Sequence, residues 1–378
     1  MLEPRDAQDL RQIVADAVAS GRKLELQGGG TRGSFGAPRE AEVLSLRQIS
    51  GVVDYDPAEL VLTLRPGTPL DEVRALVAGE GQMLAFEPWG GEGATIGGTI
   101  AAGVAGSRRV TAGSARDHLL GVTVVSGRGE VFVAGAKVVK NVTGYDLPKL
   151  MAGSWGRLGA MTELTLKVLP RPRQTVTMLA RGLAPAAAHA AMACALGCNA
   201  EVSAAAHLQT GEVLLRLAGF APSVTARCAA LPGLMAAHCT LEQLTEEEAA
   251  PLWHQAMTGS GLAGETRWRV HLPPRHAAEL VGALEPHGAQ WAMDWGGGQV
   301  WVALDRSDDL VRQQAARLGG EAALVAAAPE MRARVAALHP RCSAVANLEQ
   351  RVRRAFDPAG VFATGRFTED TDADQFSA

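Results

Sequence analysis

The sequence predicts an α+β fold made of two regions that differ in composition. Of the 43 glycines, 26 fall within residues 1–170 and only 17 within residues 171–378. The first region shows short strand-like runs joined by glycine-rich turns, whereas the second follows a β-α-β-β-α-β order that occurs twice. A length of 378 residues agrees with at least two domains, because a single domain usually spans roughly 100–200 residues.

The first region opens with a helix, predicted by apolar residues at helical spacing over 6–19. A short strand over 23–27 then runs directly into three consecutive glycines. The other elements expected here are strands at 42–46, 60–65, 121–126, 130–133 and 161–169, and a helix at 69–80. Pro170 to Arg173 alternates proline with arginine and is expected to be a linker.

The second region repeats one order of elements, which is the order of the ferredoxin-like split unit. The first unit is predicted as strand 174–180, helix 185–196, strands 201–207 and 212–218, helix 222–230 and strand 236–240. A helix at 245–257 leads to the second unit, predicted as strand 266–272, helix 276–285, strands 289–294 and 299–304, helix 307–318 and strand 321–325. A last helix over 343–356 precedes a polar tail that we expect to be frayed.

Composition excludes several functional classes. A net charge of −4 leaves no basic surface of the kind that nucleic-acid-binding proteins present. Five cysteines, an odd number without metal-ligand spacing, argue against a disulfide framework and against a zinc or iron–sulfur site, so we expect no metal. The charged N-terminus does not resemble a signal peptide, and the longest uncharged run, 182–200, is too weakly apolar to span a bilayer. We therefore expect a cytoplasmic protein.

The motif G-x-G-x-x-G occurs literally at residues 28–33, after a strand. A nicotinamide-binding Rossmann site also needs a helix that opens at this loop. Gly36 and Pro38 prevent a helix from starting there, so the Rossmann interpretation fails, and the absence of Gly-Lys-Ser/Thr excludes a P-loop. A glycine-rich turn remains, whose backbone amides can approach an anion closely.

Two further glycine-rich segments, 88–106 and 153–159, accompany this turn. Each glycine inside a regular element costs about 0.5–1 kcal/mol relative to alanine, so close packing alone explains three such segments poorly. A dinucleotide bound mainly by backbone donors would account for all three.

Ordered motifs in these segments resemble the vanillyl-alcohol-oxidase type (PCMH-type) FAD-binding domain. They are Gly28 to Thr31, Pro88 with Thr95 to Gly98, Lys140 to Leu147, and Gly153 to Gly159. Within that superfamily the chain is most similar to the smaller FAD-binding subunits of bacterial glycolate oxidase. That similarity lies in Gly113 to Asp117, Trp268 to Pro273, Asp294 to Gly297, Asp357 to Phe362 and Gly365-Arg366.

The resemblance implies an architecture of a two-part PCMH-type FAD-binding domain at 1–172, an α+β cap of duplicated ferredoxin-like units at 173–340, and a C-terminal helix and tail at 341–378 that return to the FAD domain. It also implies that the first glycine loop holds the FAD pyrophosphate. The residues expected at FAD are Gly28, Gly29, Gly30, Thr31, Pro88, Thr95, Ile96, Gly97, Gly98, Gly103, Arg116, Asp117, Lys140, Gly153, Ser154, Gly156, Gly159 and Arg366. Thr31 and Arg32 stand in the first glycine loop, where no His or Cys is present for covalent attachment, so the FAD is expected to be non-covalent.

The sequence indicates the residues of substrate oxidation less clearly than those expected at FAD. Oxidation of a 2-hydroxy acid needs a base for the hydroxyl proton and a cation for the carboxylate. Arg269 is the candidate cation, with a salt bridge between the cap and the FAD domain as the alternative role. His271 is favoured as an ordinary strand residue over a base, and Tyr145 and Asp146 as a turn over an acid pair.

The resemblance implies a FAD-binding subunit of a glycolate oxidase or dehydrogenase complex that oxidises glycolate to glyoxylate. Its implied partners are a larger FAD-binding catalytic subunit and an iron–sulfur subunit, which would allow a peripheral membrane association at the inner face. Two alternatives stay open: a stand-alone FAD-dependent 2-hydroxyacid dehydrogenase, and a non-catalytic subunit that holds flavin or completes an interface.

Overall fold

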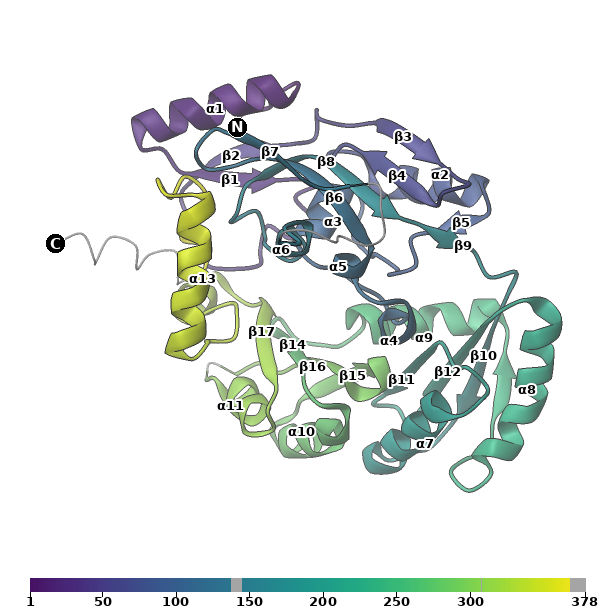
Figure 1. The fold of residues 1–378 in the computed structure, drawn as a ribbon. Coiled ribbons are helices and arrows are strands. Elements are labelled where there is room, and N and C mark those ends of the chain that lie inside the picture. Colours follow the sequence, from purple (N-terminus) through teal and green to yellow (C-terminus); the bar gives the residue numbers. More distant parts are fainter. Residues whose placement is uncertain (137–144, 307, 368–378) are drawn as a thin grey trace.

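A computed structural model describes residues 1–136, 145–306 and 308–367, and it places the chain in two layered halves (Figure 1). In the first half, helix α1 (Ala7–Ser20) packs beside a parallel pair of strands, β1 (Leu24–Gln27) and β2 (Glu42–Ser45). Asp6 caps α1 by accepting from the backbone of Gln8 and Asp9.

A five-stranded antiparallel sheet forms the rest of the first half, in the order β3-β4-β8-β6-β7. Its strands are β3 (Val52–Asp56), β4 (Val61–Leu64), β6 (Leu119–Val125), β7 (Val131–Gly135) and β8 (Ala160–Lys167). Helix α2 (Leu70–Gly79) buries its apolar side against this sheet, and the small pair β5 (Gln82–Met83) and β9 (Leu169–Pro170) lies at the sheet's end. The expected linker therefore starts inside a strand pair.

Short helices occupy the segments that look irregular in the sequence. They are α3 (Ile96–Ala101), α4 (Arg109–Ala112), α5 (Ala115–His118) and α6 (Pro148–Met151). Helix α3 forms in the middle of the second glycine-rich segment, with Thr95 as its N-cap. Its position is fixed because the Gly97 amide donates to the Pro66 carbonyl at 2.9 Å.

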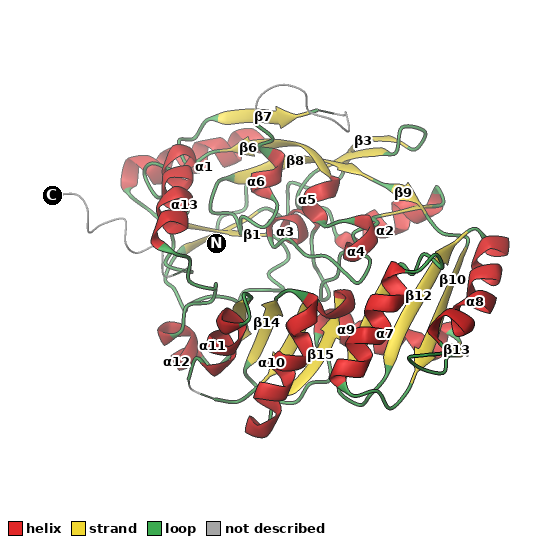
Figure 2. Ribbon diagram, turned by 60° about the horizontal axis from the view of Figure 1, so that its bottom comes forward, coloured by secondary structure: helices red, strands yellow, loops and turns green. Residues whose placement is uncertain are grey.

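One continuous eight-stranded sheet dominates the second half, in the order β13-β10-β12-β11-β15-β16-β14-β17 (Figure 2). Its strands are β10 (Gln174–Ala180), β11 (Ala204–Leu208), β12 (Val213–Gly219), β13 (Glu242–Leu244), β14 (Arg267–His271), β15 (Gln290–Asp294), β16 (Gln299–Ala303) and β17 (Glu321–Ala326). Each split unit supplies four strands, and the second strands of the two units, β11 and β15, pair antiparallel. The predicted duplication is confirmed.

Four helices cover the outer face of this sheet, and one covers part of the inner face that looks toward the first half. The outer helices are α7 (Pro185–Gly197), α8 (Ala221–Met235), α10 (Ala277–Leu284) and α11 (Leu310–Arg317). Helix α9 (Glu246–Thr258) packs on the inner face of the first unit, where Trp253 donates to Thr177 at 2.9 Å. Helix α9 also reaches the second unit, where it contacts β15, and the Trp301 indole of β16 donates to the Met257 carbonyl at 3.1 Å.

The C-terminal part returns to the first half. After α12 (Pro329–Arg334), helix α13 (Ser343–Phe356) places Val352 and Phe356 against the core of the five-stranded sheet. Val361 and Phe362 then enter the core beneath α1. The expected frayed tail lies outside the described residues.

The main disagreement with the expected elements concerns the fourth strand of the first unit. The sequence predicts a strand at 236–240, but α8 continues to Met235 with Pro232 inside it, and β13 begins only at Glu242. Strand β3 is not predicted, because its residues are mostly exposed and show no apolar alternation. In the described ranges, no helix has both the length and the apolar character needed to cross a bilayer.

Candidate functional site: a glycine-lined cavity and an adjoining arginine pocket

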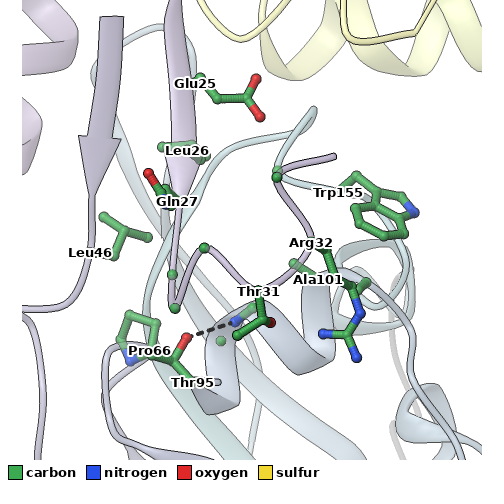
Figure 3. A pocket seen from close by; sticks show the side chains of 18 of the residues that line it. Glu25, Leu26, Gln27, Thr31, Arg32, Leu46, Pro66, Thr95, Ala101 and Trp155 are labelled. Carbon is green, nitrogen blue, oxygen red and sulfur yellow. Dashed lines mark hydrogen bonds between the residues drawn. The ribbon is translucent and has the colours of Figure 1, made fainter. Parts of the chain in front are cut away.

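A cavity of about 260 Å³ opens where the three glycine-rich segments meet (Figure 3). One wall is β1 with the loop that follows it, and another is helix α3. Several apolar side chains also line it; they are Leu26, Val43, Leu46, Pro66 and Met161. Such a mixed lining suits a ligand that has both an apolar ring and a polar chain.

The loop after β1 presents free backbone donors to this cavity. Within the described residues, the N–H groups of Gly29, Gly30 and Thr31 donate to no other protein group. Gly30 has a φ of 72°, a left-handed conformation that glycine adopts without strain. Consecutive amides without protein partners in such a turn form a nest that is suited to bind an anion.

Glycine is required in this loop because it packs tightly against the second glycine-rich segment. A Cβ on Gly28 would lie 2.3 Å from the Thr95 hydroxyl oxygen, and a Cβ on Gly29 would lie 1.9 Å from the Gly93 carbonyl oxygen. Both distances are too short for any side chain. The amides at the start of α3 are already bonded internally, since Gly97 donates to Pro66 and Gly98 to the Thr95 hydroxyl. These residues therefore shape the cavity wall, while the first loop supplies the free donors.

The third glycine-rich segment joins the site through the end of α3. The Gly153 amide donates to Ile100 and the Trp155 amide to Ala101, at 3.0 and 2.9 Å. Gly103 faces Gly153 so closely that a Cβ on Gly103 would lie 3.2 Å from the Gly153 Cα. All three segments identified in the sequence are thus brought together.

A buried ion pair closes one end of the cavity. Arg366 donates to Glu25 at 2.7 Å, to the Phe35 carbonyl at 2.9 Å and to the Arg32 carbonyl at 2.7 Å. Arg39 and Thr364 also bind the Glu25 carboxylate, and these partners hold its pKa below the usual value despite the burial that raises it. Because all three guanidinium nitrogens of Arg366 donate to protein groups, Arg366 holds the glycine loop in place.

The expected FAD residues divide into three groups. Those that line the cavity are Gly28, Gly29, Gly30, Thr31, Thr95, Gly97, Gly98, Gly156, Gly159 and Arg366. Those placed outside its lining are Pro88, Ile96, Gly103, Arg116, Asp117, Gly153 and Ser154. Lys140 lies outside the described residues. The second group is largely structural: Ile96 is a core residue, and Asp117 caps α5 by accepting from Ser114.

Sequence reasoning missed several lining residues, including Glu25, Gln27, Arg32 and Arg39. The ion pair of Glu25 with Arg366 joins positions 341 residues apart, which local patterns do not reveal. A weak signal existed in Glu25 itself, a carboxylate in a four-residue strand that leads into the glycine loop.

A second pocket, of about 230 Å³, adjoins the cavity and shares Thr31, Arg32, Ala102 and Trp155 with it. It lies between the two halves of the molecule, because its other lining includes Trp89 from the first half and Arg269 and Trp301 from the eight-stranded sheet. Arg32 lies over the Trp89 ring at 4.9 Å and donates to the Trp89 carbonyl. No aspartate or glutamate lines this pocket among the described residues.

Arg269 is the most unusual residue of this pocket. Within the part of the chain that the structure describes, it forms no ion pair, and its buried Nε has no hydrogen-bond partner. Burial, with a smaller contribution from Arg32 and Arg109, lowers its pKa to about 10, so the guanidinium stays charged at neutral pH. The described residues therefore offer no partner for the salt bridge considered as its alternative role.

The other catalytic candidates are placed in structural roles. Neighbouring His271 stacks on Trp295 with ring centroids 5.1 Å apart, and its Nε2 lies 3.3 Å from the Gln299 side-chain oxygen. Burial and the charge of Arg269 lower the His271 pKa to about 3, which keeps the ring neutral. Tyr145 is 91% exposed, so an acid pair of Tyr145 with Asp146 would lie on the surface with no enclosed site.

Similarity to known proteins agrees with this geometry. A family model described as an FAD binding domain matches residues 1–135. Over 361 residues the chain is 34% identical to glycolate oxidase subunit GlcE of Escherichia coli strain K12, covering 95% of this chain and 97% of that protein. Glycolate oxidase subunit GlcD of Bacillus subtilis strain 168 is 32% identical over 183 residues, which are 48% of this chain and 39% of that protein.

Among solved structures, alkyldihydroxyacetonephosphate synthase superposes with a TM-score of 0.66 at 14% identity. The match covers 94% of this chain and 75% of that one. At this low identity the similarity concerns the fold alone, and it confirms the predicted α+β class.

Proposed function

The chain belongs to the family of GlcE-type glycolate oxidase subunits, and on that basis we propose that it is the FAD-binding subunit of a glycolate oxidase complex that oxidises glycolate to glyoxylate. The observation that carries the proposal is the set of free amides at Gly29, Gly30 and Thr31, aimed at a cavity with an apolar wall. This arrangement fits the pyrophosphate and ring system of a dinucleotide.

FAD, when bound, supplies the acceptor for the electron pair that leaves the substrate carbon. The protein's own part is to bind and orient this cofactor. The free amides of the first loop would hold the pyrophosphate, and Arg366 would keep that loop in position through Glu25 and two carbonyls. Neither His nor Cys lines the cavity among the described residues, which supports non-covalent binding.

The same proposal includes the domain division: a FAD-binding domain at 1–172, a cap at 173–340 and a returning C-terminal segment at 341–378. It also includes the partners, a larger FAD-binding catalytic subunit and an iron–sulfur subunit, which would carry electrons away. The support is that the chain is similar to one glycolate oxidase subunit, GlcE, over 95% of its length and to another, GlcD, over 48% of its length.

Flavin content is the direct test, and Thr31→Asp is the variant of choice. Thr31 is exposed and lines the cavity, so an aspartate there would fold normally but repel the pyrophosphate. Gly97 is a poorer probe, because a Cβ there would lie 2.5 Å from Pro66 and disturb the fold itself. We expect the purified wild-type chain to carry FAD, released by denaturation, and Thr31→Asp to lose most of it.

Thr225→Asp is the matched control, since Thr225 is an exposed threonine of α8, on the far side of the second half. It should retain the flavin of the wild type. Equal flavin content in Thr31→Asp and wild type, with both proteins folded by circular dichroism, would place FAD elsewhere and overturn the proposed site.

A further inference from the structure

We propose that the arginine pocket is a binding site for a small carboxylate, held by Arg269, so that this subunit contacts an organic acid itself in addition to holding flavin. The pocket is defined by its lining from both halves, principally Arg32, Trp89, Arg267, Arg269 and Trp301. The inference rests on the proposed function in one respect only, which is that FAD lies in the adjoining cavity.

The first argument is the unsatisfied charge of Arg269. Arg269 is half-buried, and its Nε is buried without a hydrogen-bond partner, so part of the guanidinium has lost hydration that no described protein group replaces. The described chain gives it two further positive charges as neighbours, Arg32 and Arg109, and no carboxylate. Such an arrangement is unfavourable for the protein alone and becomes favourable when an anion enters.

The second argument is that the other two arginines of the pocket are already bonded and Arg269 is not. Arg32 donates to the Trp89 carbonyl at 2.9 Å, and Arg267 donates to the Leu262 carbonyl at 3.1 Å. Arg269 lines the same pocket from strand β14, two residues from Arg267 and on the same face of the sheet. Among the described residues, the guanidinium of Arg269 is therefore the one in this pocket whose N–H donors are left for a ligand.

The third argument concerns the kind of anion. A guanidinium presents parallel N–H donors that match the two oxygens of a carboxylate. The pyrophosphate of FAD already has its own donors at Gly29 to Thr31, in the adjoining cavity. The indole rings of Trp89 and Trp301, whose centroids are 6.0 Å apart, form an apolar wall beside Arg269 that would contact the carbon skeleton of an acid.

Oxalate is the probe, because it is a two-carbon acid that cannot be oxidised at a hydroxyl-bearing carbon. Binding is measured by calorimetry and by quenching of tryptophan fluorescence, on FAD-loaded and on flavin-free protein, with ethylene glycol as the uncharged comparison. We expect the wild type to bind oxalate and not to bind ethylene glycol. The affinity for oxalate should be about 10-fold to 100-fold lower in Arg269→Gln, which is the usual range for the loss of hydrogen bonds to a charged group. The affinity of Arg269→Lys for oxalate should lie between those of the wild type and Arg269→Gln, since lysine keeps the positive charge but lacks the parallel N–H donors of a guanidinium.

Thermal stability separates a ligand-binding residue from a structural one. Removing an unpaired buried charge should leave the melting temperature of Arg269→Gln equal to or above that of the wild type, whereas removing one partner of a salt bridge would lower it. Arg275→Gln, the same change at an exposed arginine, is the control for both measurements.

The outcomes are distinct from those of the proposed function. If the protein carries FAD but oxalate binds wild type and Arg269→Gln equally, or binds neither, the carboxylate site is wrong and the FAD site stands. If oxalate binds only flavin-free protein, its site is the FAD cavity itself and the proposal fails. Oxalate binding that depends on Arg269, in a protein that never takes up flavin, would support the carboxylate site while removing the proposed function.

Discussion

The Ser107 hydroxyl donates a hydrogen bond of 2.7 Å to the Asp294 carboxylate and thereby joins the end of the second glycine-rich segment to strand β15 of the eight-stranded sheet. The same carboxylate accepts from the Trp295 amide at 2.7 Å, and the Trp295 indole donates to the Gly106 carbonyl. The two halves of the molecule thus meet at a completely buried acid beside the glycine segment that lines the 260 Å³ cavity.

This junction should make stability depend on pH. Burial raises the Asp294 pKa to about 7, against about 3.9 in an unfolded chain. Between these values the folded protein binds one more proton, so the free energy of unfolding should fall as the pH rises, by up to about 1.4 kcal/mol per pH unit. The stabilisation that Asp294 contributes through its raised pKa is fully present below about pH 4 and is lost above about pH 7. Asp294→Asn should flatten this slope in urea titrations, whereas Asp16→Asn, an exposed control, should not; an unchanged slope in Asp294→Asn would contradict the assignment.

Glu87 should be the main ionic connection between the halves. It accepts from both terminal nitrogens of Arg216 at 2.8 and 2.9 Å and also pairs with Arg108 at 3.2 Å, while Arg216 lies over Trp253. Glu87→Ala leaves Arg216 partly buried and unpaired, so we expect a loss of about 2–3 kcal/mol of unfolding free energy, below the range for fully buried pairs because the Glu87 side chain is 22% exposed.

A double-mutant cycle tests this directly. Adding Arg216→Gln to Glu87→Ala should lower the free energy of unfolding only slightly further, because the second change removes the Arg216 charge that the first left unpaired. Strictly additive losses would show that the two side chains do not stabilise each other.

Arg366→Lys should loosen the glycine loop without unfolding the protein. A lysine keeps the charge near Glu25 but cannot bond Glu25 and the Phe35 and Arg32 carbonyls together. We expect FAD affinity, measured by fluorescence titration of flavin-free protein, to fall about 10-fold, which corresponds to one lost charge-assisted hydrogen bond. Arg181→Lys, on the exposed surface, should leave the affinity unchanged. Wild-type affinity in Arg366→Lys would mean that the loop is held by other contacts.

Two glycine substitutions should have opposite effects. Gly29→Ala places a Cβ 1.9 Å from the Gly93 carbonyl oxygen, so it should lower the melting temperature and the FAD content together. Gly282 lies inside helix α10, where an added Cβ would meet nothing within 4 Å, so Gly282→Ala should stabilise the protein by about 0.5–1 kcal/mol and keep its FAD. Calorimetric melting with flavin quantification checks both, and a tolerated Gly29→Ala would contradict the close packing of the loops.

Most of the second half can be predicted from the sequence because its elements are long and locally patterned. Strand 174–180 of this half is found with the same bounds, and so is helix 343–356 of the returning C-terminal part, whose apolar residues keep helical spacing. The sequence does not reveal that β11 and β15 pair and fuse the two units into one sheet, because that contact depends on two edges with no shared local signal.

Prediction of the site is limited in the same way, because local sequence patterns are visible whereas contacts between distant residues are not. The glycine segments carry a visible composition, so their presence is evident, but helix α3 escapes prediction because Gly97 and Gly98 are poor helix formers. Tertiary contact overrides that preference, with the Gly97 amide bonded to Pro66. The motif Trp268 to Pro273 is enough to select Arg269 as the candidate cation for a carboxylate. Its lack of a partner within the described chain, however, is a property of three-dimensional packing.

The pairing of β11 with β15 gives the cap an approximate two-fold symmetry, as if two copies of one ancestral module had dimerised edge to edge and then become joined in one chain. Symmetric modules would offer two equivalent inner faces. Helix α9 breaks the equivalence by lying over the first face, where Trp253 bonds to Thr177 of β10. The corresponding first strand of the second module, β14, is the one that carries Arg269. The two modules therefore differ in chemistry at equivalent positions: the first strand of one bonds a tryptophan of α9, and the first strand of the other carries Arg269.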